Sequence, residues 1–501
     1  MENVQSTRHS FRDVHALVVG LAREGTALTR FLVERGARVI VTDAKPAEAL
    51  GDSLAALEGL PVTYALGGHP LELLDGVNVV FVSPGVPLEI SLLEAARQRG
   101  LPLSSETRLF TRFCPAPVVG ITGSSGKTTT TALVGEMLKA AGYRTWVGGN
   151  IGQPLVSHLA EIAPSDVVIM ELSSFQLEFF RPVMGDWAEE RIGRLLGQLL
   201  DPLGWSPPFA ALLNVTPNHL DRHPTMAAYT AAKIQILAYQ RESDVAVLNL
   251  DNRVTRALGQ AIDSCPEVRK QRILWFSLEQ EVEDGAFLRD RELIVRLAGQ
   301  QEVVCRTEEL KLRGQHNVAN MLAACALAGA VVAQGERRLD VALSALCQAS
   351  TSFEGVEHRL ELVRERNGVR WYNDSIATTP ERTVAALHAF SGEPIVLLAG
   401  GRDKHLPWGE MVAATQDTAR HLILFGEAAD LIEQNMKAAG RGQLETNIHH
   451  AGTLERAVTL ANQLARPGDV VLLSPGGTSF DAYADYEARG EHFRQLVRRL
   501  E

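Results

Sequence analysis

The sequence predicts an α/β protein divided into three domains, each built on a largely parallel sheet. The length is the first indication, because 501 residues correspond to about three domains at roughly 150 residues each. The second indication is a recurring pattern in which a short aliphatic run ends at Gly and a helix-like stretch follows. Near-continuous aliphatic strands that alternate with helices are typical of a parallel sheet covered on both faces.

The first domain is expected over residues 1–115 and opens with a Rossmann-like unit. An apolar strand over 14–20, a helix-like stretch over 24–35 and a strand over 38–42 form a strand–helix–strand unit of a parallel sheet. A dinucleotide fingerprint requires Gly where this chain has Ala22. We therefore expect a nucleotide-like ligand at the strand ends, in preference to the NAD of an oxidoreductase.

The central domain is expected over residues 116–352, and its strongest signal is a phosphate-binding loop. Residues 120–130 read GITGSSGKTTT between an apolar strand and a helix-like run. Such a turn directs backbone N–H groups and a helix N-terminus at a phosphate chain. Lys127 is placed to reach the β- and γ-phosphates and Thr128 to bind Mg²⁺, although Ile121 stands where the strict pattern has Gly. The loop predicts a bound nucleoside triphosphate and a P-loop ATPase-type fold.

Three further polar residues of the central domain are candidates for catalysis. Glu171 ends a strand, where a carboxylate can reach a triphosphate-bound Mg²⁺ or, equally, cap a helix. His219 follows another strand and stands beside Asp221, which makes it a candidate second metal ligand. Lys233 lies in an apolar-flanked helical stretch and by itself would pass as an exposed helix lysine.

Residues 353–501 are expected to form a third, Rossmann-like domain. Apolar runs at 359–363 and 369–372 flank an Asn-Gly pair, which is a strong β-hairpin signal. Three aliphatic strands follow, each leading into a Gly-containing turn. One segment, at about 182–208, breaks the alternation of strands and helices. Its leucines recur at helical spacing, so we expect a helical insertion packed on the central domain.

The composition argues against several classes of protein. A net charge of −11 with no run of Lys or Arg argues against a nucleic-acid partner. The first 13 residues lack the apolar core of a signal peptide, and no stretch is continuously apolar over the about 18 residues that a membrane span needs. The five cysteines form no Cys-x-x-Cys pair, which indicates reduced thiols in a cytoplasmic protein.

Taken together, these stretches resemble the Mur ligase family over essentially the whole chain. The motifs that carry the resemblance are residues 122–129, 149–152, 171–178, 214–222, 231–233, 314–320, 358–361, 373–375 and 473–475. The phosphate-loop motif is shared with folylpolyglutamate synthases. The Ser-Ser-Phe-Gln-Leu-Glu run at 173–178 and the Asn-Asp-Ser-x-Ala-Thr run at 373–378 resemble the branch of the family that adds D-glutamate.

The resemblance implies an ATP-dependent amide ligase of peptidoglycan precursor synthesis. Its substrates would be ATP, UDP-N-acetylmuramoyl-L-alanine and D-glutamate, joined through an acyl-phosphate intermediate in a cytoplasmic, monomeric enzyme. The alternative is a related Mur ligase, or a folylpolyglutamate-synthase-like ligase, that uses another amino acid. A dinucleotide-dependent oxidoreductase and a non-catalytic nucleotide-binding protein are readings from other classes. Ala22 argues against the first, and the joint presence of Lys127, Glu171, His219 and Lys233 argues against the second.

The resemblance also assigns roles in the central and third domains. ATP would be held by Gly123, Ser124, Ser125, Gly126, Lys127, Thr128, Thr129, Asn317, Asn320, Arg359 and Asp374. Two Mg²⁺ ions would be bound by Thr128 and Glu171 and by His219 and a carbamylated Lys233. Carbamylation converts a cation into an oxygen ligand, which explains a lysine at a hard-metal site.

Substrate contacts follow from the same resemblance. The UDP moiety would contact Arg23, Glu24, Ala44 and Ser83, the muramoyl group Asn150 and Ser173, and D-glutamate Thr378, Lys404, Ser479 and Tyr486. The chain departs from the family pattern at Ile376, where many members carry Lys. We expect Arg402 or Lys404 to supply the missing cation.

Overall fold

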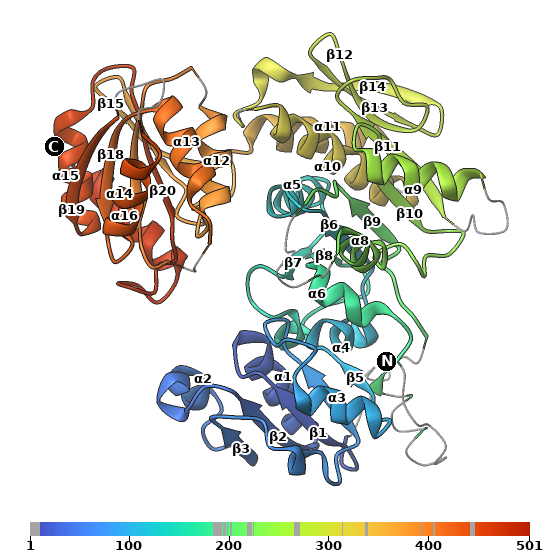
Figure 1. Ribbon diagram of the computed structural model, residues 1–501. Coiled ribbons are helices and arrows are strands. Elements are labelled where there is room, and N and C mark those ends of the chain that lie inside the picture. The colour runs from blue at the N-terminus through green and yellow to red at the C-terminus, as the bar shows by residue number, and fades with distance from the viewer. Residues whose placement is uncertain are drawn as a thin grey trace. The chain divides into compact units, whose positions relative to one another are not determined.

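The computed structural model contains three β-sheets, arranged in two compact units (Figure 1). The first unit comprises Met1–Leu310 and Gln315–Ser352, and the second comprises Lys311–Gly314 and Phe353–Glu501. Each unit is described by itself. The residues that the structure describes are 11–183, 193, 197, 199–200, 203–217, 223, 225–264, 271–312, 314–335, 339–390, 392–403, 406–440 and 446–500.

The N-terminal sheet of the first unit has five parallel strands in the order β3-β2-β1-β4-β5. Its strands are β1 His15–Val19, β2 Arg38–Asp43, β3 Val62–Leu66, β4 Val79–Val82 and β5 Leu103–Ser104. Its helices are α1 Arg23–Glu34, α2 Gly51–Ala56, α3 Ser91–Gln98 and α4 Glu106–Phe113. β1 is the central strand and is hydrogen-bonded to both β2 and β4. Its carboxyl end is therefore the point where the strand order reverses, which is where open α/β sheets bind ligands.

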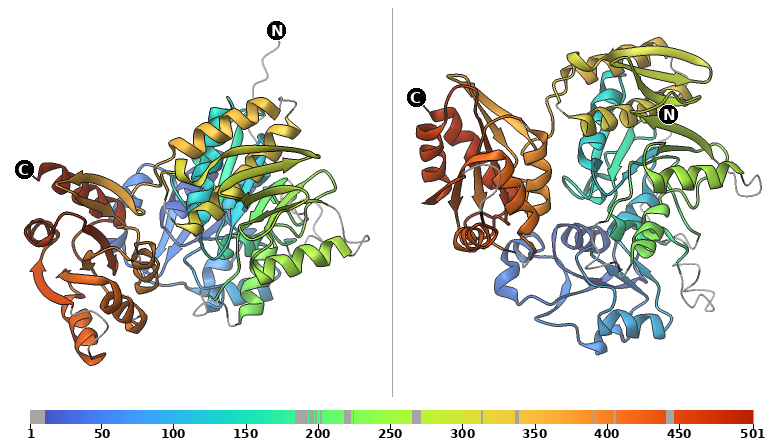
Figure 2. Two further views of the ribbon diagram at one scale, coloured as in Figure 1. Left: turned by 90° about the horizontal axis from the view of Figure 1, so that it is seen from above. Right: turned by 45° about the horizontal axis from the view of Figure 1, so that its top comes forward.

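The central sheet has nine strands in the order β14-β13-β12-β11-β10-β9-β6-β8-β7. They are β6 Val118–Thr122, β7 Thr145–Gly149, β8 Val167–Glu171, β9 Phe209–Leu212, β10 Val245–Asn249, β11 Arg272–Ser277, β12 Gly285–Arg289, β13 Glu292–Leu297 and β14 Gln300–Arg306. All neighbours from β7 to β12 are parallel, and β13 and β14 extend the sheet as an antiparallel meander, visible in yellow-green in Figures 1 and 2.

Helices pack around the central sheet, and one of them is unusually apolar. The helices are α5 Lys127–Ala140, α6 Ser174–Leu177, α8 Met226–Ile234, α9 Arg253–Ser264, α10 Gln315–Gln334 and α11 Leu339–Ser352. By length and composition alone α10 could cross a membrane, but its apolar window is 78% buried. It packs against α5 and α11 and against the central strands, which is the environment of a core helix.

The second unit holds a six-stranded sheet in the order β15-β16-β20-β17-β18-β19. Its strands are β15 Glu361–Arg366, β16 Val369–Asn373, β17 Ile395–Gly400, β18 Ala419–Phe425, β19 Asn447–Gly452 and β20 Val470–Gly476. Its helices are α12 Pro380–Ala389, α13 Gly409–Thr418, α14 Ala429–Ala438, α15 Leu454–Leu464 and α16 Tyr486–Arg499. Only β15 runs antiparallel.

The expected α/β class is confirmed, and the hairpin of the third domain is confirmed in detail. Asn367 and Gly368 have φ angles of 52° and 74°, as a tight hairpin turn with two left-handed residues requires. The strands β3, β5, β7, β11, β12, β13, β14 and β19 were not predicted. Of these, β3, β7 and β19 are partly exposed and lack a continuous aliphatic run.

The segment at 182–208 lies mostly outside the described residues, including Ile192, Leu195 and Leu196. Among those that are described, Leu199 and Leu200 are buried in a cluster formed largely by the N-terminal domain. The segment therefore contributes to the N-terminal core, in addition to the expected packing surface of the central domain.

A glycine at the end of β17 tests how tightly the second unit is packed. Gly400 has φ +152°, and an added Cβ would lie 1.8 Å from the carbonyl oxygen of Phe425. We expect Gly400→Ala to lower the free energy of unfolding by about 2–4 kcal/mol, measured by urea denaturation of the purified chain. Gly409→Ala is the matched control, because nothing lies within 4 Å of its added Cβ. Equal unfolding midpoints for the two variants would contradict the prediction.

Candidate active site

The phosphate loop connects β6 to α5, and β6 lies between β9 and β8 in the central sheet. Gly126 precedes the first residue of α5 with φ +82°. A Cβ at this position would meet the Asn320 side-chain oxygen at 2.2 Å, so the loop also depends on a side chain from α10. The first N–H groups of α5 are left without helical partners, as at every helix start, and they form an anion-binding end.

The loop is held in shape by its own lysine and by the chain that follows β9. The Lys127 ammonium donates to the carbonyls of Gly123 at 3.1 Å and Ser124 at 3.3 Å. The backbone N–H of Ser125 donates to the Asn214 side-chain oxygen at 2.9 Å. These bonds preorganise the turn. Asn214 was not predicted as a site residue, although it is the first residue of the motif at 214–222.

Glu171 ends β8, the strand next to β6, and is only 2% exposed. Its Oε1 accepts a hydrogen bond from the Asn150 side-chain amide at 2.8 Å. Its Oε2 is buried and has no hydrogen-bond partner among the described residues. A buried carboxylate oxygen without a partner is unfavourable, so this atom is suited to a cation or another donor beside the phosphate loop.

Lys233 reaches the same loop from α8. It is 2% exposed, and its Nζ donates to the Gly123 carbonyl at 2.8 Å and to the Thr122 hydroxyl at 3.4 Å. Burial, reinforced by the positive charge of Lys127, lowers the pKa of Lys233 to about 6. The interpretation of Lys233 as an exposed helix lysine is therefore excluded.

The remaining residues assigned to ATP in this unit lie close by. Thr128 is half-buried and Thr129 is buried in the first turn of α5. Asn317 lies in the first turn of α10, and its side-chain oxygen accepts from the Asn320 amide at 3.3 Å. His219 lies outside the described residues.

A pocket of about 440 Å³ is lined by both domains of the first unit. The N-terminal domain contributes all four residues assigned to the UDP moiety: Arg23, Glu24, Ala44 and Ser83. The central domain contributes Gly149, Gly152 and Pro154. Arg23 donates to the Gly152 carbonyl at 3.1 Å, and the hydroxyl of Ser83 donates to the Gly20 carbonyl at 2.9 Å. The structure thus gathers these predicted residues at the end of β1.

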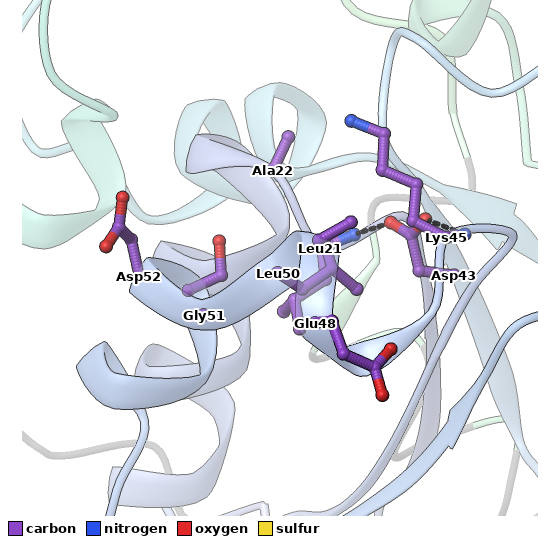
Figure 3. Close-up of a pocket in the computed structure, with 10 residues that line it drawn as sticks. Leu21, Ala22, Asp43, Lys45, Glu48, Leu50, Gly51 and Asp52 are labelled. Carbon is purple, nitrogen blue, oxygen red and sulfur yellow. Dashed lines mark hydrogen bonds between the residues drawn. The ribbon is translucent and has the colours of Figure 1, made fainter. Parts of the chain in front are cut away.

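A second pocket of about 420 Å³ adjoins the same strand ends, and Asp43 shapes it (Figure 3). The Asp43 carboxylate accepts from the backbone N–H of Leu21 at 2.7 Å and from that of Lys45 at 2.9 Å. It therefore ties together the loops that follow β1 and β2. Asp43 was not assigned a role from the sequence, although its place directly after the second strand is the signal that identifies it.

Ser173, assigned to the muramoyl group, caps the short helix α6. Its side chain accepts from the backbone N–H of Gln176, and the Gln176 amide oxygen accepts in return from the backbone of Ser173. The other end of the Gln176 amide donates to Glu24 at 3.1 Å. Gln176 was not predicted as a site residue.

In the second unit, Asp374 braces the loop that carries Arg359. Asp374 is buried and accepts from the Leu360 backbone at 3.3 Å and from the Ser474 hydroxyl at 2.8 Å. Burial raises the pKa of Asp374 to about 7. Its oxygens are thus engaged within the protein, while the neighbouring Arg359 remains half-exposed.

Two of the residues assigned to D-glutamate, Thr378 and Ser479, lie in loops next to segments that a buried arginine holds. Arg489 is fully buried and donates to the hydroxyl and carbonyl of Ser375 at 3.0 and 2.8 Å and to the Gly477 carbonyl at 3.2 Å. Burial lowers the pKa of Arg489 to about 10. Ser375 also donates to the Tyr486 carbonyl at 2.8 Å. Arg489 was missed, because an arginine in a polar C-terminal helix reads as exposed.

The structure bears on which cation replaces the lysine that many family members carry at the position of Ile376. Arg402 makes a two-pronged ion pair with Glu427 at 2.8 and 2.9 Å and is therefore already engaged. Lys404 lies outside the described residues. The exposed Arg382 donates to the Ile376 carbonyl at 2.9 Å, so it is a cation that the sequence did not single out. The other assigned positions are Thr378, which is half-buried, and Ser479, which is buried.

The phosphate loop on a parallel sheet, with a further α/β sheet on each side of it in the sequence, defines a three-domain nucleotide-binding protein. Residues 14–105 match the family described as "Mur ligase MurD-like, N-terminal domain". Residues 121–187 and 196–328 match "Mur ligase middle domain", and residues 358–477 match "Mur ligase, glutamate ligase domain". The chain belongs to the Mur ligase family.

Curated relatives match nearly the whole chain. The UDP-N-acetylmuramoylalanine--D-glutamate ligase of Symbiobacterium thermophilum is 42% identical over 490 residues, which cover 97% of this chain and 98% of that protein. The protein of the same name from Pelotomaculum thermopropionicum is 39% identical over 484 residues and 96% of each chain. The solved UDP-N-acetylmuramate-alanine ligase of Thermotoga maritima has a TM-score of 0.55 at 18% identity, covering 97% of this chain and 99% of that one, and shows the same fold.

Gly126, the residue directly before α5, gives a test of the nucleotide site. We expect Gly126→Ala to weaken ADP binding at least about tenfold, or ~1.4 kcal/mol, because its Cβ collides with Asn320 and its φ is left-handed. Isothermal titration calorimetry with ADP measures the effect. Gly409→Ala again serves as the control, and an unchanged dissociation constant in Gly126→Ala would refute the role of this turn.

Proposed function

We propose that the chain is an ATP-dependent ligase that adds D-glutamate to UDP-N-acetylmuramoyl-L-alanine during peptidoglycan precursor synthesis. The observation that carries the proposal is the convergence of Lys127, Glu171 and Lys233 on one phosphate loop. The relatives named above match this chain over nearly their full length, and their names support the choice of substrate and amino acid. The matched domain described as a glutamate ligase domain supports it further.

The three domains then divide the substrates among them. We propose that residues 1–115 bind the UDP moiety, residues 116–352 bind ATP, and residues 353–501 bind the amino acid. The pocket lined by Arg23 and Ser83 supports the first assignment, and the phosphate loop supports the second. Thr378, Lys404, Ser479 and Tyr486 are proposed to form the D-glutamate site, while Asn317, Asn320, Arg359 and Asp374 are proposed to complete the ATP site.

The reaction transfers a phosphoryl group and then an acyl group. The alanine carboxylate of the nucleotide sugar attacks the γ-phosphorus of ATP, ADP leaves, and an acyl phosphate results. The amine of D-glutamate then attacks the acyl carbon, loses a proton and expels inorganic phosphate. Lys127 and the amides at the start of α5 are placed to stabilise the charge that builds up on the phosphoryl oxygens.

The residues beside the loop fit Mg²⁺, which when bound neutralises phosphate charge and aligns the reacting oxygens. Thr128 and Glu171 are proposed to hold one ion, and the buried, unpartnered Oε2 of Glu171 supports this. His219 and a carbamylated Lys233 are proposed to hold a second ion. Carboxylate-like and hydroxyl oxygens are the ligand types that Mg²⁺ prefers.

The surroundings of Lys233 support the proposed carbamate on its amine. The amine is buried against the loop and forms no ion pair within the described part of the chain. In the reaction, the Nζ lone pair attacks CO₂, an N–C bond forms and one proton is released. The product places two oxygens where an ammonium stood. We further propose that the protein is a cytoplasmic monomer; the four cysteines that the structure describes, all free, support a reducing location.

The amino-acid specificity is the direct test of the proposed function. We expect phosphate release to require ATP, Mg²⁺, UDP-N-acetylmuramoyl-L-alanine and D-glutamate together, with L-glutamate a much poorer substrate. A coupled phosphate assay over a panel of amino acids measures this. Turnover with L-lysine or meso-diaminopimelate that equals turnover with D-glutamate would contradict the proposal.

The role of Lys233 is tested by removing it. We expect Lys233→Ala to lose ~3 kcal/mol or more of transition-state stabilisation, which is a fall of about 100-fold in kcat, because a charged ligand beside the phosphates is lost. Added acetate or formate should restore part of the activity. The same assay on Lys139→Ala, an exposed helix lysine of the same domain, should give wild-type rates. Near-normal turnover by Lys233→Ala would show that no carbamate is needed.

A further inference from the structure

The pocket of the N-terminal domain and the phosphate loop are connected by a chain of hydrogen bonds that begins at Glu24. Glu24 is the second residue of α1 and lines the 440 Å³ pocket. Its Oε1 accepts a hydrogen bond from the side-chain amide of Gln176 at 3.1 Å. The two residues are 152 positions apart in the sequence. This bond therefore joins the pocket wall of one domain to a helix of the next.

Gln176 passes the connection to the end of β8. It is fully buried, and its amide oxygen accepts from the backbone N–H and the hydroxyl of Ser173, each at 3.0 Å. Both ends of the amide are thus occupied, which allows only one orientation of the side chain. Ser173 is two residues beyond Glu171, so the same bonds define where β8 ends and α6 begins.

The end of β8 is in turn bonded to the phosphate strand. The Leu172 carbonyl accepts from the Thr122 hydroxyl at 2.7 Å, and the Leu172 N–H donates to the Ile121 carbonyl at 2.8 Å. The same Thr122 hydroxyl accepts from Lys233 at 3.4 Å. The connection from Glu24 to Lys233 therefore runs through half-buried and buried groups: hydrogen bonds at or below 3.4 Å, joined by the peptide bond between Leu172 and Ser173.

A second carboxyl group, that of Glu106, interacts electrostatically with Glu24. Glu106, at the start of α4, is buried and accepts from the Val156 backbone of the central domain at 3.2 Å. Burial raises the pKa of Glu24 to about 7 and that of Glu106 to about 8, and the charge of Glu24 contributes to the latter. The pair thus retains protons near neutral pH, so the pocket wall does not present two full negative charges to an anionic ligand.

We propose that Glu24 is a positioning residue, which acts through Gln176 to couple the nucleotide-sugar pocket to the geometry of the phosphoryl-transfer site. This inference rests on the proposed function for the nature of the two ligands. A ligand that seats against α1 sets Glu24, Glu24 sets the Gln176 amide, and Gln176 sets the turn that carries Glu171. Glu24 does not need to touch the reacting atoms.

The test is a double-mutant cycle in the phosphate-release assay with D-glutamate. Glu24→Ala removes the acceptor, Gln176→Met removes both polar ends while keeping the buried volume, and Glu24→Gln keeps an acceptor oxygen for Gln176. Glu34→Ala is the matched control, since Glu34 is an exposed glutamate at the far end of the same helix. The values of kcat and of KM for the nucleotide sugar are measured for each variant and for the double variant.

We expect kcat to fall about tenfold or more in Glu24→Ala and in Gln176→Met. The kcat of the double variant should lie within about twofold of the kcat of the less active single variant. Glu34→Ala should stay within about threefold of wild type, and Glu24→Gln should retain clearly more of the wild-type kcat than Glu24→Ala does. A rise in KM with unchanged kcat in Glu24→Ala would mean a ligand contact only and would overturn the inference. Losses that multiply in the double variant, or a Glu24→Gln variant as impaired as Glu24→Ala, would also overturn it.

The failure of the proposed function is distinguishable in the same series. Wild-type protein that releases no phosphate with any amino acid refutes the proposed function. The coupling is then read from ADP binding by calorimetry, where Glu24→Ala and Gln176→Met should bind ADP less tightly than wild type and Glu24→Gln should not. Identical ADP dissociation constants in all variants would overturn the inference.

Discussion

The constraint on which the active unit depends is the carbonyl of Gly123, which accepts hydrogen bonds from the Nζ atoms of two lysines. Lys127 approaches it from α5 and Lys233 from α8, at 3.1 and 2.8 Å. Two like charges in a buried place are unfavourable, which is one reason why the pKa of Lys233 falls. The neighbouring carboxylate of Glu171 offsets part of this charge. A negative group, such as a phosphate chain or a carbamate, would offset the rest, so the charge around this loop suits the proposed chemistry.

The N-terminal and central domains meet through hydrogen-bonded side chains, and two of these, Arg23 and Glu24, also line the pocket. Arg23 bonds to the Gly152 carbonyl, Glu24 to Gln176 and Glu106 to the Val156 backbone. The residues proposed to bind the nucleotide sugar and those that hold the domains together therefore overlap at Arg23 and Glu24. A change in one function is expected to change the other, because buried polar networks lose more than the sum of their single bonds when one member is removed.

In the second unit, a buried cation holds loops in place. Arg489 holds the loops at Ser375 and Gly477 through carbonyl and hydroxyl oxygens, with no ion pair in the part of the chain that the structure describes. A guanidinium has five donors, so it can order two loops without a carboxylate partner. Asp374 performs the complementary task for the loop of Arg359. Thr378 and Ser479, two of the residues proposed for D-glutamate, thus lie within three residues of the segments that Arg489 holds.

The sequence by itself determined the α/β class, the phosphate loop and the hairpin at Asn367, because each is encoded by neighbouring residues: aliphatic runs, Gly-Lys-Thr before a helix and a left-handed turn pair. The resemblance of its motifs also named Lys127, Glu171 and Lys233, which the structure brings to one loop. Only the tertiary structure decided the roles of Gln176, Arg489 and Asp43. Gln176 reads as an ordinary helix residue until a carboxylate 152 positions away accepts its amide. Hydrogen bonds between distant segments leave no local pattern, since their geometry exists only after the sheets have packed.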